Sequence, residues 1–130
     1  MATSVAVSVR DEQAYVAGER CNGGYLRIYG GEQPSGPESK AGAPLAELRF
    51  GSPAFGKPVK GKITANKITK DDNARGSGDA TWYRVLSADG DAVWDGDVSK
   101  KGKGGSLELD ALTIRSGAEV SVGSLTYTQP

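Results

Sequence analysis

The sequence predicts a mainly β protein: an antiparallel β-sandwich, jelly-roll or immunoglobulin-like, with a short N-terminal helix or arm. First, apolar and polar residues alternate in short runs from Gly24 onward, which is the period of half-buried strands. Second, Gly-rich turns separate these runs, and 19 of the 130 residues are glycine. Third, the chain is too short to divide into two stable cores. We therefore expect an arm or short helix over residues 1–23 and one sandwich domain over residues 24–130.

The first residues alternate valines with small residues. Val5, Val7 and Val9 follow this pattern, which indicates an edge strand over residues 1–8 or an arm that docks on a partner. We expect such an arm to pair with its partner by adding a strand to the partner's sheet.

A short helix is expected over residues 9–20. Ser8 can accept hydrogen bonds from its first turn, and the acids Asp11 and Glu12 suit the positive end of the helix dipole. Asn22-Gly23-Gly24 ends the helix, because glycine suits the left-handed position after a helix. A weak apolar stripe follows the helical period: Val9, Gln13, Val16 and Arg20.

Further strands follow from alternation. Residues 25–29 and 45–50 alternate cleanly, and residues 30–44 between them form a long Gly- and Pro-containing loop. A corner at residues 51–56 carries Phe55, which we expect to anchor it in the core. The remaining expected strands are 59–68, with a break near Ala65-Asn66, then 107–114, irregular near Asp110-Ala111, and 119–128.

The clearest element is a hairpin. Residues 79–86 and 91–98 alternate on either side of Asp89-Gly90, a dipeptide typical of hairpin turns. We expect Trp82 and Trp94 to be cross-strand neighbours and to supply much of the core together with Phe55.

The last strand contains a change of phase. Val120 and Val122 occupy even positions, whereas Leu125 and Tyr127 occupy odd ones. A regular strand would send the two pairs to opposite faces. We therefore expect a β-bulge at Gly123-Ser124, since one extra residue restores a common face.

The composition excludes several kinds of catalytic and metal-binding site. The chain has no histidine and a single cysteine, Cys21, so a Ser-His-Asp triad, a Cys-His pair, a histidine metal site and an internal disulfide are all impossible. We expect no enzyme, no cofactor and no metal site. Two motifs fall short: the P-loop-like residues 56–62 are followed by Ile63 where Ser or Thr is needed, and the acidic hairpin has Val93 where a calcium loop needs an acid. Loose cation binding by the hairpin stays open.

Charges are balanced overall but separated along the chain. Sixteen basic residues offset sixteen acidic ones, and few aromatics lie among the lysines, so nucleic-acid binding is not expected. Lysines can protect an exposed strand edge from aggregation. We also expect Lys57, Lys60 and Lys62 to pair with Asp95 and Asp97 of a neighbouring subunit, an assembly contact that gives orientation.

No targeting or membrane segment is expected. The first 25 residues lack the apolar run of a signal peptide, and no stretch approaches 18 apolar residues. We expect a soluble chain made in a reducing cytoplasm.

A series of short segments resembles a family of small structural proteins of tailed bacteriophages. In order, they cover about residues 24–128: Leu26-Arg27-Ile28-Tyr29, Leu45-Ala46-Glu47-Leu48, Phe50-Gly51-Ser52-Pro53-Ala54-Phe55-Gly56, Ile63-Thr64-Ala65-Asn66, Gly78-Asp79-Ala80-Thr81-Trp82-Tyr83-Arg84 and Asp95-Gly96 with Val98.

This resemblance implies a non-catalytic β-sandwich of the virion, encoded among head and tail genes and synthesised in the cytoplasm of the bacterial host. We expect a capsid decoration (cement) protein that binds the major capsid protein or neighbouring virion subunits and forms a homo-oligomer in the particle. Two alternatives remain: a head–tail neck or tail subunit, or a carbohydrate- or receptor-binding module that uses Trp82, Tyr83 and Trp94. The lysines of residues 57–70 and 100–103 and the weakly helical N-terminal segment depart from the family pattern.

Overall fold

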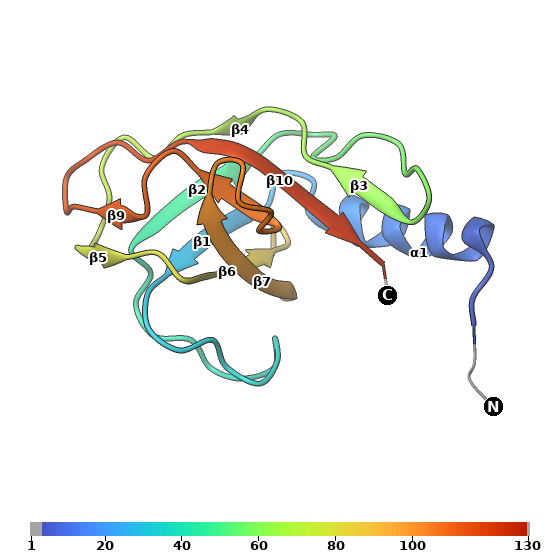
Figure 1. Cartoon of the computed structure of the whole chain (residues 1–130), viewed down its shortest axis with the longest axis horizontal. Coiled ribbons are helices and arrows are strands. Elements are labelled where there is room, and N and C mark those ends of the chain that lie inside the picture. The colour runs from blue at the N-terminus through green and yellow to red at the C-terminus, as the bar shows by residue number, and fades with distance from the viewer. Residues whose placement is uncertain (1–3, 130) are drawn as a thin grey trace.

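The computed structural model of the chain describes residues 4–129. It contains one helix and a curled sheet of many short strands, so the protein is mainly β with a short N-terminal helix, as the sequence predicts (Figure 1). The helix is α1 (Val7–Arg20). The strands are β1 (Tyr25–Tyr29), β2 (Ala46–Phe50), β3 (Lys62–Thr64), β4 (Ile68–Thr69), β5 (Gly78–Asp79), β6 (Trp82–Leu86), β7 (Ala92–Lys100), β8 (Leu107–Leu109), β9 (Thr113–Ile114) and β10 (Val122–Thr128).

Eight strands form one sheet in the order β3-β10-β8-β7-β6-β1-β2-β4, and β5 and β9 form a separate pair. The two outermost strands, β3 and β4, are consecutive pieces of the segment 62–71. The sheet therefore curls until both of its edges meet on one stretch of chain. The predicted break at Ala65-Asn66 is confirmed, because it separates β3, which pairs with β10, from β4, which pairs with β2.

One pair of strands is parallel, so the expectation of an entirely antiparallel sheet is wrong. Val98 of β7 lies opposite Leu107 of β8 in a parallel register. Parallel neighbours ordinarily need a crossover of about a dozen residues or more, but here only residues 101–106 separate the strands. Gly102 and Gly104 have φ values of 84° and 90°, which lets the chain fold back sharply along β7.

The hairpin of β6 and β7 is confirmed, but its register differs from the expected one. Trp82 lies opposite Asp97 and Val85 lies opposite Trp94, with a register shift beside Leu86. The extra residue is Val93. Because side chains alternate between faces, this shift places the two tryptophans on opposite faces of the sheet. The expectation that Trp82 and Trp94 are cross-strand neighbours is therefore wrong.

The inner face of the hairpin packs into the core of the curled sheet. Trp94 lies beside Phe55, with ring centroids 5.7 Å apart, and both belong to the main cluster of buried side chains. The Trp94 indole N–H donates to the Tyr83 hydroxyl at 3.1 Å, and that hydroxyl lies 2.9 Å from the Ser106 hydroxyl. Tyr83 itself covers Gly96 on the neighbouring strand. These contacts hold the Tyr83 ring in one position.

The outer face carries a second buried layer. Trp82 stacks on Tyr29 with a centroid separation of 4.3 Å, and its indole N–H donates to the carbonyl of Gly30 at 3.2 Å. Arg84 lies beside the Trp82 ring and forms a two-bond ion pair with Asp95, at 2.7 and 3.0 Å. The two side chains of this pair are only 7% and 3% exposed. Trp82 is thus buried outside the main cluster.

The bulge in the last strand is confirmed. The pairing of β10 with β8 shifts between Val122 and Ser124. A Cβ atom on Gly123 would lie 3.1 Å from the carbonyl oxygen of Glu108, so the bulged position leaves little room for a side chain. Across residues 4–129, no helix is both long enough and apolar enough to cross a membrane.

We expect Gly96→Ala to lower the free energy of unfolding by about 1–3 kcal/mol. The added methyl group would overlap the end of the Tyr83 ring, which its two hydroxyl partners prevent from moving aside. Gly42→Ala is the matched control, because nothing lies within 4 Å of the Cβ position at Gly42. Urea denaturation measures both variants, and equal stability of the two would contradict this packing argument.

We expect Asp95→Asn to lower the free energy of unfolding by about 3 kcal/mol, since it leaves the buried Arg84 guanidinium without its counter-ion. Asp91→Asn changes the same charge at an exposed position and should change stability by less than about 0.5 kcal/mol. Thermal and urea unfolding provide the comparison. The double variant Arg84→Met/Asp95→Leu should recover most of the loss; a double variant less stable than Asp95→Asn would contradict the explanation.

Candidate interaction surface

Helix α1 turns its small residues toward the sheet. Ala14, Gly18 and Cys21 are buried, and a Cβ atom on Gly18 would lie 3.0 Å from a methyl group of Ile63 and 3.2 Å from Phe55. Small side chains let the helix approach β3 and the 51–56 corner closely. Burial also raises the pKa of the Cys21 thiol to about 12, so this thiol is protonated and unreactive at neutral pH.

The start of the helix differs from the expectation. α1 begins at Val7 after Ala6, and no side chain caps it, so Ser8 lies inside the first turn and is not its cap. Val7 and Val9 are helical, and the Val9 amide donates to the Ala6 carbonyl. The prediction of an edge strand is therefore wrong for Val7 and Ser8. Residues 1–3 of the proposed arm lie outside the described residues.

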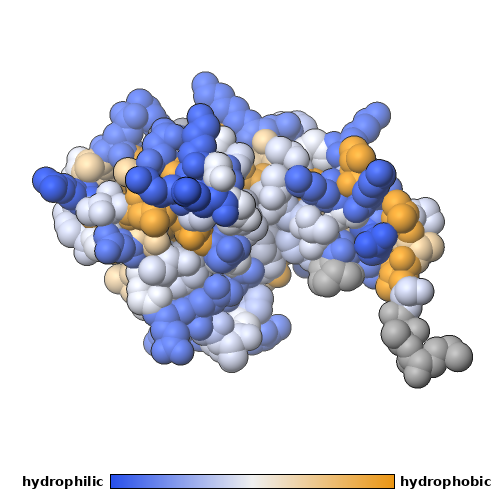
Figure 2. Space-filling model, viewed as in Figure 1, coloured by the Kyte–Doolittle hydropathy of each residue, from blue (hydrophilic) through white to orange (hydrophobic). Residues whose placement is uncertain are grey.

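The apolar stripe of the helix faces away from the core. Val9 and Val16 are about half exposed, at 43% and 54%, although the stripe they form would ordinarily be the buried side of an amphipathic helix. Val5, Val7 and Tyr15 are exposed to a similar degree. Hydrophobic side chains gather at the end of the molecule that carries α1 (Figure 2).

A turn from another part of the chain joins this end. The Gly61 amide donates to the Asp11 carboxylate at 2.6 Å, and a Cβ atom on Gly61 would lie 3.2 Å from the Cβ of Arg10. Gly61 has a φ of 76°, so glycine suits this position for both space and backbone conformation. The turn presents Val59, the most exposed large hydrophobic residue described, at 67%.

Three lysines lie in and beside this turn. Lys57, Lys60 and Lys62 are all exposed, and none forms an ion pair within residues 4–129. We define the end surface as these lysines together with the exposed apolar side chains of α1 and its turn: Val5, Val7, Val9, Tyr15, Val16 and Val59. The structure thus brings two predicted interface groups, from opposite ends of a 58-residue stretch of sequence, to one end of the molecule.

The two predicted acidic partners differ in their surroundings. Asp95 is buried in its ion pair with Arg84, so it cannot meet a lysine of a neighbour without exposing the Arg84 charge. Asp97 is exposed and accepts a hydrogen bond from the Ser106 hydroxyl at 3.1 Å. Asp97 and Lys62 line one shallow hollow of about 600 Å³ beside Trp94 and Tyr127.

The aromatic residues suggested for sugar binding are buried. Trp82, Tyr83 and Trp94 are 3%, 1% and 8% exposed, and burial raises the pKa of the Tyr83 hydroxyl. A sugar ring stacks on the open face of an aromatic ring, and none of these three offers one. In the acidic hairpin, as in the rest of residues 4–129, no group of three or more acidic, cysteine or histidine side chains is arranged to hold a metal ion.

Three members of the end surface were missed from the sequence: Tyr15, Val16 and Val59. The available signal was the second stripe on the helix, formed by the small residues Ala14, Ala17, Gly18 and Cys21. A stripe of small residues can bury a helix face as well as large ones do, and it leaves the larger valines outside. Val59 could not be assigned, since nothing in the sequence shows that residues 59–62 contact α1.

No family model matches the chain, and searches among curated proteins and solved structures also find no match.

Proposed function

We propose that this chain is a non-enzymatic structural protein of a tailed-phage virion, a capsid decoration protein that binds the head shell through the end surface. The observation that carries the proposal is the group of exposed apolar side chains at the end of the molecule that carries α1, where three lysines also lie that form no ion pair among the described residues. The family resemblance of the sequence supports the choice of particle. The partner is the major capsid protein or a neighbouring virion subunit.

The composition of the end surface fits a protein–protein contact. Exposed apolar side chains that gather at one end of a molecule are typical of interaction sites, and interfaces commonly combine apolar groups with charged ones. The free lysines select a partner surface with acidic residues around an apolar centre. Each contact can be weak, since a symmetric shell repeats it many times and multivalency holds the layer in place.

The helical conformation changes the proposed mode of contact. A strand-addition arm needs extended backbone with free peptide groups, whereas Val7 to Val9 are helical and the amides of Val9 and Arg10 donate to the Ala6 carbonyl. We propose that the side chains of Val9 and Val16, which lie on one side of α1, enter a groove of the partner, as an amphipathic helix does. Residues 4–6, which precede the helix, extend the same apolar surface through Val5.

We also propose that the curled sheet is a variant of the β-sandwich. One half consists of β4, β2, β1 and β6, and the other of β3, β10 and β8, with β7 between them. Leu48 from the first half and Leu125 from the second belong to one core cluster, as residues of two facing sheets do. The parallel β7–β8 pair distinguishes this arrangement from an all-antiparallel jelly roll.

Two alternatives differ in where the contact is made. A neck or tail subunit would use the same end surface on a ring of low copy number. A carbohydrate-binding module would need an exposed aromatic platform, and burial of Trp82, Tyr83 and Trp94 weighs against the candidates named for it.

Val16→Asp should abolish binding to heads of the phage that lack this protein, because it places a charge on the same side of α1 as Val9. Folding should be retained, since Val16 is 54% exposed. Ala88→Asp, at the exposed hairpin turn, is the control and should bind like the unchanged protein. Co-sedimentation with purified heads measures binding, and equal binding by both variants would remove the end surface from the proposal.

Copy number distinguishes the head from the neck and tail. Quantitative mass spectrometry of purified particles should find hundreds of copies for a decoration protein, against about six or twelve for a neck or tail ring. Absence of the protein from purified particles would overturn the virion proposal altogether. Glycan binding that a folded Trp94→Ala variant loses would favour the carbohydrate-binding alternative.

A further inference from the structure

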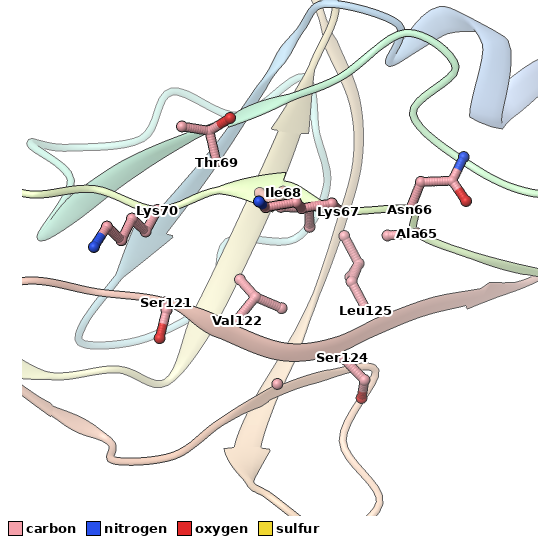
Figure 3. Close-up of a pocket in the computed structure, with 11 residues that line it drawn as sticks. Ala65, Asn66, Lys67, Ile68, Thr69, Lys70, Ser121, Val122, Ser124 and Leu125 are labelled. Carbon is pink, nitrogen blue, oxygen red and sulfur yellow. The ribbon is translucent and has the colours of Figure 1, made fainter.

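The wall of the curled sheet has an opening between β4 and β10 (Figure 3). At one end of the opening the Ala65 amide donates to the Leu125 carbonyl at 2.9 Å. At the other end Asp71 and Val120 exchange two backbone hydrogen bonds, at 2.9 and 2.7 Å. Between these closures, no backbone hydrogen bond joins the described residues 66–70 to residues 121–124. We call this opening the slot.

The peptide groups of β4 reach the slot at Ile68. In an antiparallel ladder, successive residues bond alternately to the two sides. The Phe50 amide donates to Gly24 and so faces away from β4, which makes Arg49 and Thr69 the bonded pair between β2 and β4. Ile68 therefore directs its N–H and C=O away from β2 and toward β10.

The peptide groups of β10 reach the slot at Val122. Its partner on β8 is Leu109, whose carbonyl accepts a hydrogen bond from the Lys101 amide on the other side. Val122 and Leu109 are thus a non-bonded pair, and Val122 directs its N–H and C=O away from β8. The bulge at Gly123-Ser124 follows directly, so it bends β10 at the slot. Two strand edges with free peptide groups face each other there.

The side chains around the slot supply an apolar lining and a basic border. Ile68, Val122 and Leu125 are among the apolar groups that line a hollow of about 680 Å³, a size within the range of about 300–1,000 Å³ for ligand sites. On the β4 side, Lys70 is paired with Glu119 at 3.0 Å, but Lys67 is exposed and forms no ion pair among the described residues. Lys67 is thus the free charge of the slot.

We propose that the slot binds an extended peptide segment of another protein, which lies between β4 and β10 as an added strand. The free groups of Ile68 and Val122 would bond to the backbone of the incoming segment, the usual basis of recognition by strand addition. Alternate apolar side chains of the segment would contact the lining, and an acidic residue would pair with Lys67. The five residues 66–70, which form no backbone hydrogen bond with β10, correspond to about 17 Å of strand.

The free backbone groups favour a peptide over an apolar small molecule. A fatty acid could fill the lining and place its carboxylate near Lys67, but it would leave the peptide groups of Ile68 and Val122 without partners. Buried peptide groups without hydrogen bonds are costly. This site is separate from the end surface, so it does not depend on the proposed decoration function and can be tested on the isolated protein.

The test uses a synthetic five-residue peptide with valine at the second and fourth positions, threonine between them and aspartate at both ends. NMR titration should show saturable binding, with slowed hydrogen exchange at the amides of Ile68 and Val122. The same peptide with N-methylated valines should not bind, because the methyl groups remove the donors that an added strand needs. Lys67→Glu should weaken binding about tenfold, a loss of about 1.4 kcal/mol, while Lys57→Glu, on the end surface, should leave it unchanged.

Three results would overturn the proposal. The first is absence of saturable binding at millimolar peptide, and the second is equal binding of the N-methylated peptide. The third is binding of dodecanoate at the slot without binding of the peptide, which would identify a site for apolar acids. None of these results bears on the end surface, which the Val16→Asp variant tests separately.

Discussion

The segment 62–71 is the constraint on which the rest of this structure depends. Its first part pairs with β10 and its last part with β2, so ten residues connect the two edges of an eight-stranded sheet. An open sheet of this length would expose two edges to solvent and to other chains. Closure through one segment protects most of both edges and encloses one core. Because the segment must leave β10 to reach β2, it also creates the slot between them.

Two single-residue insertions adapt the strands to this curvature. The extra residue at Val93 sends Trp82 and Trp94 to opposite faces, which divides the aromatic side chains between the inner core and an outer layer. The outer layer holds Trp82 over Tyr29 and Arg84 against Asp95. The bulge between Val122 and Ser124 keeps the apolar side chains of β10 directed inward. The chain has few large apolar residues, yet it forms two buried layers, because the Arg84–Asp95 ion pair makes up part of the second layer.

The end surface results from how α1 meets the sheet. The sheet receives Ala14 and Gly18 from the helix, and Val9 and Val16 stay outside with Val59. Larger side chains on the inner side would hold the helix away from Ile63 and Phe55. Because the small residues of α1 lie on its inner side, the helix packs closely against the sheet and its valines stay on the outer side. The three lysines add positive charge to that end of the molecule.

The sequence alone determined the local elements: the helix up to Arg20, β1 and β2, the Asp89-Gly90 hairpin and the bulge at Gly123-Ser124. Each rests on periodicity or turn chemistry within a few residues. Only the tertiary structure decided which face of α1 is buried, where Lys57, Lys60 and Lys62 lie relative to Val9, and that Asp95 is held by Arg84. These depend on contacts between residues far apart in the chain and on a one-residue shift at Val93. Alternation predicts that a strand has two faces, but packing decides which partner each face meets.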